Sequence, residues 1–350
     1  MSDSTNVMAS ADIGEAAESH KRQAQERLPV LVIAGPTASG KSALAAGLAR
    51  QFDGIVINAD SMQVYRDLPI LTAQPSQPEQ AAVPHRLYGF QAIDDVCSAE
   101  RWASLARGEI DTARETGKLP ILCGGTGLYL RALMEGFSPI PDVPPDVRRQ
   151  ARRLLDEIGS AELRKRLAVG DPESAARLHA HDRQRIVRAW EVLQATGRPL
   201  SEWQKLPPAS PPGLRFLTFI PKPERDALYR CCDGRFVAML ERGALDEVRR
   251  ALKRYPGLYA PDRAPPEGGA KALGFWGLAR HASEGTEVAE ATIAAAQQET
   301  RNYAKRQGTW FRNQLPGGNF ITPAAPDMQF SESSYAGISQ KIRGFLLTED

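Results

Sequence analysis

The chain's 350 residues predict two domains, or one large domain that carries an insertion, and 42% hydrophobic with 25% charged residues is ordinary for a soluble globular enzyme. The net charge of +2 at pH 7 excludes no class of partner, because a nucleic-acid binder can concentrate its cations on one face. No apolar run approaches the roughly 18–20 residues of a membrane span, so we expect a cytoplasmic protein without membrane contact.

The cysteines and residues 1–27 give further information on the class of protein and its compartment. The four cysteines form no CxxC pair and no Cys/His cluster, which argues against a structural zinc site and fits a reducing compartment. Residues 1–27 are polar and rich in alanine, and five of them are acidic. This composition predicts a disordered tail and neither a signal peptide nor a transit peptide.

The first predicted elements enclose a phosphate-binding loop. A short β-branched run at 30–33 predicts a buried strand, and apolar residues at four-residue spacing predict a helix over 42–52. Between them, GPTASGKS has the spacing of the loop that holds phosphate on backbone N–H groups in ATP-binding proteins. Lys41 would place a cation on the outer phosphate and Ser42 a hydroxyl on Mg²⁺, although the motif does not settle the reaction. The predicted phosphate-binding residues are Gly35, Pro36, Thr37, Ala38, Ser39, Gly40, Lys41 and Ser42.

Two further apolar runs end in polar residues or glycines. The run at 54–59 leads to Asp60, which could be a Mg²⁺ ligand, a general base, or the cap of a helix that begins at Ser61. The run at 119–123 is followed by two glycines and Thr126. Glycines at this place permit the close approach of a ligand, or simply a tight turn.

The order of these elements predicts the fold class. A helix is expected over 99–116, with Trp102, Leu105 and Ile110 on its inward face. Strands that alternate with helices predict an α/β fold, a P-loop NTPase-like parallel sheet with helices on both faces. Open sheets of this kind bind ligands at the carboxyl ends of their strands, so the residues that follow the three strands should meet there.

Two proline-rich stretches, 138–147 and 206–213, bound a region whose pattern is helical and poor in strands. Beyond it, a strand is predicted at 215–220, and helices over 226–255 and 292–312. The predicted division is an α/β core of 28–139 with 206–322, an inserted helical domain at 140–205, and a loop-like tail at 323–350.

Two helical segments carry clustered cations. In the insertion, Gln184, Arg185 and Arg188 lie beside an apolar stripe, and amide with guanidinium groups suit phosphates and base edges. A solvated helix face is the alternative. Near the C-terminus, residues 300–314 hold four cations and no acid. These cations could reach a phosphate cleft or a nucleic-acid backbone, or belong to a plain amphipathic helix.

Taken together, five stretches resemble the tRNA dimethylallyltransferases, also called tRNA isopentenyltransferases, of the bacterial type. They follow the order of that family and are spread over residues 30–315, which makes the resemblance specific. The stretches are GPTASGKS (35–42), DSMQVYR (60–66), LPILCGGTGLYLRAL (119–133), HDRQRIVRAWEVLQATGRPLS (181–201) and TRNYAKRQGTWFR (300–312).

The resemblance implies the transfer of a dimethylallyl group from dimethylallyl diphosphate to the exocyclic amine of an adenine. That adenine lies just 3′ of the anticodon in tRNAs that read codons beginning with U. The implied partners are dimethylallyl diphosphate, Mg²⁺ and the tRNA anticodon stem-loop, and we expect a monomer. The implied catalytic residues are Asp60 as the base, Thr37 and Arg301. The implied tRNA-binding residues are Asp60, Ser61, Met62, Gln63, Thr126, Arg148, Gln184, Arg185, Ile186, Val187 and Arg188.

One segment departs from the family pattern. The family usually shows an Ile-Gly-Tyr-Lys-Glu type of sequence before its last helices, whereas Leu273–Gly277 lacks the lysine and the glutamate. Three alternatives share the phosphate loop: a P-loop small-molecule kinase, an adenylate isopentenyltransferase that acts on a free nucleotide, and a nucleic-acid-binding ATP switch.

Overall fold

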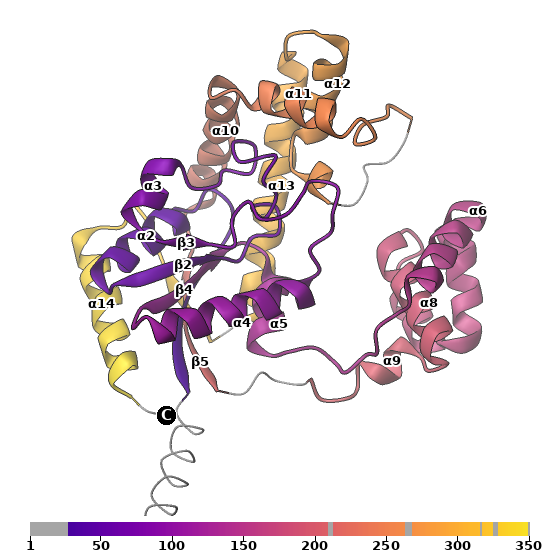
Figure 1. Ribbon diagram of the computed structural model, residues 1–350, viewed down its shortest axis with the longest axis horizontal. Helices are drawn as coiled ribbons and strands as arrows, with labels where there is room; N and C mark the ends of the chain where they lie inside the picture. Colours follow the sequence, from indigo (N-terminus) through magenta and orange to yellow (C-terminus); the bar gives the residue numbers. More distant parts are fainter. Residues whose placement is uncertain (1–26, 209–212, 263–267, 316, 325–327, 349–350) are drawn as a thin grey trace, which may run out of the picture. The chain divides into compact units, whose positions relative to one another are not determined.

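The computed structural model describes residues 27–208, 213–262, 268–315, 317–324 and 328–348 (Figure 1). The predicted tail at 1–27 therefore lies outside the described residues, apart from Arg27. The chain divides into two compact units. One unit consists of Met1–Met134 with Pro212–Asp350, and the other is Glu135–Pro211.

A parallel sheet of six described strands, in the order β3-β2-β4-β1-β5-β6, forms the centre of the first unit. The strands are β1 (Leu28–Ala34), β2 (Gly54–Asn58), β3 (His85–Arg86), β4 (Leu119–Gly124), β5 (Leu214–Pro221) and β6 (Asn319–Ile321). The four predicted strands are β1, β2, β4 and β5. The edge strands β3 and β6 were not predicted, because runs of two and three residues are too short to show a period.

Helices cover both faces of this sheet, as the sequence predicted. Val30 and Val32 of β1 pack on one face with α4 and α5, whereas Leu31 and Ile33 pack on the other with α2 and α14. This alternation follows from the two-residue period of a strand. The covering helices are α2 (Lys41–Gln51), α4 (Ala99–Glu115), α5 (Gly127–Met134) and α14 (Glu332–Leu347).

The prediction of a loop-like tail at 323–350 is wrong where the chain forms the helix α14. Its Ile338 and Ile342 are 3% and 0% exposed, and they join the core cluster that holds Leu31 and Leu44. With Tyr335 and Phe345, which pack against the same cluster, the two isoleucines recur at spacings of three and four, so the sequence does carry a helical stripe that the prediction overlooked. Only the presence of the sheet face beside them makes this stripe a packing surface.

The inward face of α4 also differs from the prediction. Trp102 and Ile110 are fully buried, but Leu105 is 37% exposed. The inward positions are Trp102, Ala106, Ile110 and Ala113, which follow the helical spacing of four, four and three. The prediction chose Leu105 because leucine is the more apolar neighbour of the small Ala106, which occupies the inward position.

A second core lies among the helices that follow β5, and it includes Phe236, Val248 and Phe275. The predicted helix over 226–255 is two helices, because Gly243 adopts a left-handed backbone with φ of 93° between them. The remaining elements of this unit are α3 (Gln77–Ala82), α10 (Arg225–Glu241), α11 (Ala244–Arg254), the short 3-10 helix η1 (Gly269–Lys271), α12 (Phe275–Glu284) and α13 (Glu290–Gln314).

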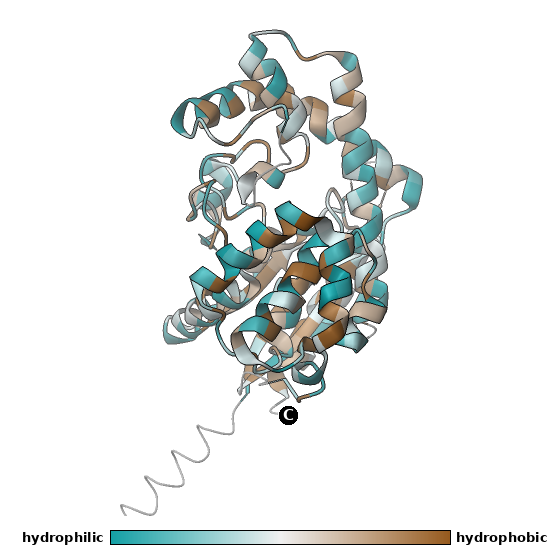
Figure 2. Cartoon of the chain, turned by 90° about the vertical axis from the view of Figure 1, so that its right-hand side faces the viewer, coloured by the Kyte–Doolittle hydropathy of each residue, from teal (hydrophilic) through white to brown (hydrophobic). Residues whose placement is uncertain are grey.

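The second unit is helical, with its core formed by residues such as Leu163, Leu167 and Ile186. Its helices are α6 (Pro145–Gly170), α7 (Pro172–Arg177), α8 (Arg183–Thr196) and α9 (Leu200–Trp203). Figure 2 shows the amphipathic character of the chain's helices, with hydrophilic residues on one side and hydrophobic residues on the other. The small core is therefore formed by one apolar stripe from each longer helix.

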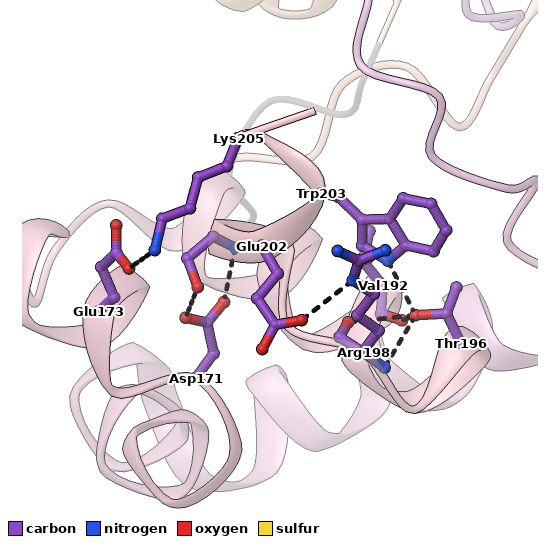
Figure 3. Close-up of polar contacts among 9 residues, drawn as sticks. Asp171, Glu173, Val192, Thr196, Arg198, Glu202, Trp203 and Lys205 are labelled. Atoms are coloured by element: carbon purple, nitrogen blue, oxygen red, sulfur yellow. Dashed lines mark hydrogen bonds and ion pairs between the residues drawn. The ribbon is translucent and has the colours of Figure 1, made fainter. Parts of the chain in front are cut away.

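Two polar clusters fix the short α9 in this unit (Figure 3). The fully buried Asp171 accepts hydrogen bonds from the backbone N–H of Ser174 and from the hydroxyl of Ser201 at 2.9 and 2.7 Å. The Arg198 guanidinium lies over the Trp203 ring and pairs with Glu202 at 3.0 Å. Buried polar groups that are satisfied in this way define the geometry of a small core.

Candidate active site

The loop Gly35–Ser42 joins β1 to α2, in the strand–loop–helix context that the motif requires. Gly40 has a φ of 81°, and a Cβ there would overlap the carbonyl oxygen of Met328. Glycine is thus required for both backbone angle and space. The loop delivers its N–H groups at the N-terminus of α2, where the helix dipole favours an anion.

Lys41, in the first turn of α2, is only 8% exposed, and its Nζ donates to the carbonyl oxygen of Pro36 at 3.2 Å. Burial lowers the pKa of Lys41 below its ordinary value of 10.5, while the nearby Cys123 and Asp60 oppose part of that shift. A buried cation with one carbonyl partner has unused donors. An anion held by the loop would supply both the charge and the acceptors that Lys41 lacks.

Gln307 of α13 connects the loop to the turn after β4. Its Oε1 accepts from the backbone N–H of Thr37 at 2.9 Å, and its Nε2 donates to the carbonyl oxygen of Gly125 at 2.8 Å. A Cβ at Gly125 would overlap the Gln307 amide, so the second glycine of the turn allows this contact. Sequence analysis gave Gln307 no role at the loop.

Arg235 of α10 is a site residue that sequence reasoning missed. Its Nη1 donates to the hydroxyl of Thr37 at 2.9 Å. Burial lowers the pKa of Arg235 below its ordinary value, and the negative charge of Asp60 opposes that shift. No motif surrounds Arg235 in the sequence, where it is one cation of a long helix, so only the packing of α10 identifies it.

Arg301, predicted to be catalytic, pairs with a carboxylate. Its Nη1 pairs with Oδ1 of Asp233 on α10 at 2.5 Å, and its Nη2 donates to Gln298 at 2.7 Å. Arg235 therefore contacts the loop directly, whereas the Arg301 guanidinium is paired with the carboxylate of Asp233. The predicted catalytic role of Arg301 stays a prediction.

Asp60 follows β2, and its backbone is fixed by the buried Asn58. The Asn58 side chain accepts from the N–H of Asp60 at 2.8 Å and donates to its carbonyl oxygen at 3.0 Å. Oδ1 of Asp60 accepts from the N–H of Met62 at 2.9 Å, which makes a local turn. Residues 59–76 contain no helix, so the alternative in which Asp60 caps a helix from Ser61 is wrong.

Thr126, after β4, meets the segment that follows β2. Its Oγ1 accepts from the N–H of Ser61 at 2.9 Å, and its own N–H donates to the carbonyl oxygen of Ala59 at 3.1 Å. Gln63 extends the same segment, and its Nε2 donates to the carbonyl oxygens of Thr72 and Ala73 at 3.0 and 2.8 Å. The predicted contact residues at 60–63 and Thr126 are therefore brought together at one edge of the sheet.

The protein oxygen atoms around the loop suit Mg²⁺ only when a bound substrate supplies further oxygen ligands. Ser42 offers a hydroxyl in the first turn of α2, and Asp60 offers carboxylate oxygens after β2. No group of three or more His, Cys, Asp or Glu side chains that could hold a metal occurs among the described residues. Hard oxygen donors in this small number suit a Mg²⁺ that shares phosphate oxygens with a substrate.

In the second unit, α8 presents the predicted RNA-binding segment. Arg185 is exposed and pairs with Asp182 at 3.4 Å, and Arg188 pairs with Glu191 at 3.6 Å. Burial raises the pKa of Glu191, while Arg188 and Arg148 oppose that shift. The carboxylate of Glu191 thus pairs with Arg188 and feels the charge of Arg148 of α6, and the RNA-binding roles of both arginines stay predictions.

Two members of this segment do not present a free side chain. Ile186 is fully buried in the core of the second unit, and Val187 packs against the same core. The Ile186 side chain therefore offers no surface to an RNA, and the prediction that Ile186 belongs to the tRNA-binding segment stays a prediction. Gln184 is exposed beside Arg185, as the predicted face requires.

Comparison with known proteins places the chain among enzymes of one kind. The model of the IPP transferase family matches residues 63–314. The tRNA dimethylallyltransferase of Rhodospirillum centenum is 54% identical over 298 residues, which cover 84% of this chain and 92% of the relative. That of Paramagnetospirillum magneticum is 50% identical over 320 residues, with 91% and 98% covered.

Solved structures agree with this placement. A tRNA isopentenylpyrophosphate transferase from Bacillus halodurans has 29% identity and a TM-score of 0.62, over 91% of this chain and 96% of that one. A eukaryotic dimethylallyltransferase acting on tRNA has 28% identity and a TM-score of 0.74, over 91% and 79%. None of the helices in the described ranges is both long and apolar enough to cross a bilayer. The chain therefore belongs to the IPP transferase family, together with the tRNA dimethylallyltransferases.

Proposed function

We propose that the chain transfers a dimethylallyl group from dimethylallyl diphosphate to N6 of the adenine 3′-adjacent to the anticodon, in tRNAs that read codons beginning with U. Diphosphate is the second product. Membership of the IPP transferase family supports this function over a P-loop small-molecule kinase or an adenylate isopentenyltransferase. We further propose that a monomer acts in the cytoplasm, where a single chain supplies both the phosphate loop and the acid at its side.

The phosphate loop is proposed to hold a diphosphate that leaves. Cleavage of the allylic carbon–oxygen bond builds negative charge on the diphosphate and positive charge on the prenyl fragment. The N–H groups of the loop, Lys41 and Arg235 are donors that are already in place when this charge develops. Thr37 supports this role, because its hydroxyl holds Arg235 and its N–H holds Gln307.

Asp60 is proposed to be the general base. The lone pair of the adenine amine attacks the terminal allylic carbon as the carbon–oxygen bond breaks, and Asp60 accepts the proton that the amine loses. The turn formed with Met62 holds the carboxylate at the end of β2. Burial lowers the pKa of both Lys41 and Arg235, and the charge of Asp60 offsets part of each shift. The base and the two cations therefore belong to one electrostatic site.

Mg²⁺ would be held by the Ser42 hydroxyl together with diphosphate oxygens, and when bound it would neutralise charge on the leaving group. The RNA is proposed to contact the segment Ser61–Gln63 and Thr126 near the base, and Arg148, Gln184, Arg185 and Arg188 on the second unit. The target adenine must leave its stack to reach Asp60.

The observation that carries the proposal is the buried Lys41 and the Arg235–Thr37 hydrogen bond at the loop, with the charge of Asp60 acting on both cations. Mass spectrometry of tRNA nucleosides after incubation with dimethylallyl diphosphate and Mg²⁺ tests it directly. A mass gain of one dimethylallyl group on the adenosine next to the anticodon is expected. Transfer to AMP in preference to a stem-loop, or release of nucleoside diphosphate from a triphosphate, would contradict it.

A further inference from the structure

Asn58, the last residue of β2, is fully buried and stands two residues before the proposed base. Its Oδ1 accepts from the N–H of Asp60 at 2.8 Å, and its Nδ2 donates to the carbonyl oxygen of Asp60 at 3.0 Å. One planar amide therefore holds the backbone groups on both sides of the Asp60 Cα. Because the carboxylate is attached to this Cα, its place depends on the Asn58 side chain.

The backbone around this turn is also held by neighbouring elements. The N–H of Ala59 donates to the carbonyl oxygen of Cys123 on β4 at 2.8 Å, and the carbonyl oxygen of Ala59 accepts from the N–H of Thr126 at 3.1 Å. The carbonyl oxygen of Asn58 accepts from the buried indole N–H of Trp102 on α4 at 2.8 Å. The amide that holds the base is thus itself fixed from both β4 and α4.

The Asn58 amide reaches a second segment as well. Its Nδ2 also donates to the carbonyl oxygen of Leu87 at 3.0 Å, and Leu87 has a left-handed backbone with a φ of 60°. A residue other than glycine keeps this conformation only when its surroundings hold it. Two residues further on, the N–H of Gly89 donates to the carbonyl oxygen of Gln63 at 3.0 Å. Asn58 therefore links the turn of the base to the segment that supports the predicted RNA contact Gln63.

We propose that Asn58 is a positioning residue for the base: its amide sets where the Asp60 carboxylate lies and links that place to the RNA-contact segment. The inference rests on the proposed function, in which Asp60 accepts the proton of the adenine amine. Proton transfer requires the carboxylate within hydrogen-bond reach of the amine, and a misplacement of about 1 Å can lower the rate by about 10²-fold. Asn58 has no described hydrogen bond to Gly35–Ser42, so its loss should alter the chemical step and not the binding of the prenyl donor.

Asn58→Ala and Asn58→Ser test this role in steady-state transfer to a synthetic anticodon stem-loop. A serine hydroxyl can still accept from the N–H two residues further on, more weakly than an amide, whereas alanine cannot. We expect kcat to fall by about 10²-fold for alanine and by less for serine, with the KM for dimethylallyl diphosphate within about twofold of the wild type. Ile342→Ala is the control, because it truncates a fully buried side chain of the same unit away from the site. At a temperature where this variant is folded, its kcat should equal that of the wild type.

A double-mutant cycle with Asp60→Asn separates positioning from a general loss of structure. In the Asp60→Asn background, Asn58→Ala should lower kcat further by less than about twofold, because a residue that acts through the base has no base left to position. Losses that multiply in the double variant would overturn the inference. An equal fall of kcat in Asn58→Ala and Ile342→Ala would also overturn it.

Amide hydrogen exchange, followed by mass spectrometry on peptides that contain residues 59–66, tests the positioning without turnover. Exchange in these peptides should be faster in Asn58→Ala than in both the wild type and Ile342→Ala, because the turn loses the amide that holds it. Exchange that stays at the wild-type rate in Asn58→Ala would overturn the role of Asn58. A wild type that binds the stem-loop but transfers no prenyl group would instead overturn the proposed function.

Discussion

The pKa values of the charged residues at the phosphate loop depend on the side chains that bury them. Lys41 and Arg235 both lose hydration, and burial is the main reason that the pKa of each lies below its ordinary value. Asp60 opposes both shifts, so the three side chains act on one another although they come from three different elements. A site of this kind is destabilised by its own cations until an anion is bound.

Asp60→Asn tests the base at this scale. The amide keeps an oxygen for the Met62 N–H but cannot accept the proton of the adenine amine. We expect kcat for prenyl transfer to fall by about 10²–10⁴, the usual range for a positioned general base, with the Kd for a stem-loop within about threefold of the wild type. A comparable loss of binding would assign Asp60 to RNA positioning instead.

Arg235→Gln and Arg301→Gln are matched variants that test which arginine stabilises the leaving diphosphate. Arg235 contacts the loop through Thr37, whereas Arg301 is engaged by Asp233. We expect Arg235→Gln to lower kcat by about 10²-fold, as for the loss of one preorganised donor, and Arg301→Gln to lower it much less. Steady-state kinetics with saturating RNA measure both, and the reverse order would return the catalytic role to Arg301.

At the scale of elements, buried polar side chains tie helices to the loops that carry the site. Glu247 of α11 is 2% exposed and accepts from the N–H groups of Ile70 and Leu71 at 2.7 and 2.8 Å. The loop that contains these residues also supplies the two carbonyl oxygens that hold Gln63. The position of a predicted RNA contact thus depends on a helix about 180 residues away in the chain.

Glu247→Ala should destabilise the protein by about 1–3 kcal/mol, because the buried N–H groups of Ile70 and Leu71 lose their acceptor. Burial raises the pKa of Glu247 above its ordinary value of 4.5. The folded state then binds more protons than the unfolded state above about pH 4.5, so this group's stabilisation falls as the pH rises through the raised pKa. Urea unfolding from pH 4.5 to 8 should show the wild-type advantage shrinking with pH, and a growing advantage would refute the assignment.

The predicted RNA-binding face of α8 can be tested by its salt response. Arg185 and Arg188 are at the surface, with side chains 76% and 42% exposed. We expect each alanine variant to weaken stem-loop binding and to reduce the salt slope by about 0.7–0.9 if it removes one phosphate contact. Lys165→Ala is the control, since this exposed residue of α6 pairs only locally with Glu162. A slope that stays at the wild-type value would argue against phosphate contact.

For the whole molecule, the last helix completes the main core. β6 adds the final strand beside β5, and α14 then places Ile338 and Ile342 against the face of the sheet that α2 also covers. The chain segment before α14 passes the phosphate loop, where Met328 is buried beside Ala38. The C-terminal region is therefore part of the structure that holds the loop in position.

Ile342→Ala should lower the free energy of unfolding by about 2–5 kcal/mol, because a fully buried side chain is truncated within a packed core. Leu347→Ala is the matched control on the same helix, since Leu347 is 85% exposed and its loss should change stability by no more than about 0.5 kcal/mol. Thermal or urea unfolding measures both. Equal effects would mean that α14 is only loosely attached.

The sequence by itself determined the α/β class, the phosphate loop, four of the strands and the resemblance to one family, because these depend on short-range patterns. Only the tertiary structure decided that Arg235 contacts the loop and that Gln307 joins the loop to Gly125. Each of these depends on contacts between residues far apart in the chain, which leave no period or spacing in the sequence. A local pattern fixes which elements form, whereas the role of a side chain depends on which element packs against it.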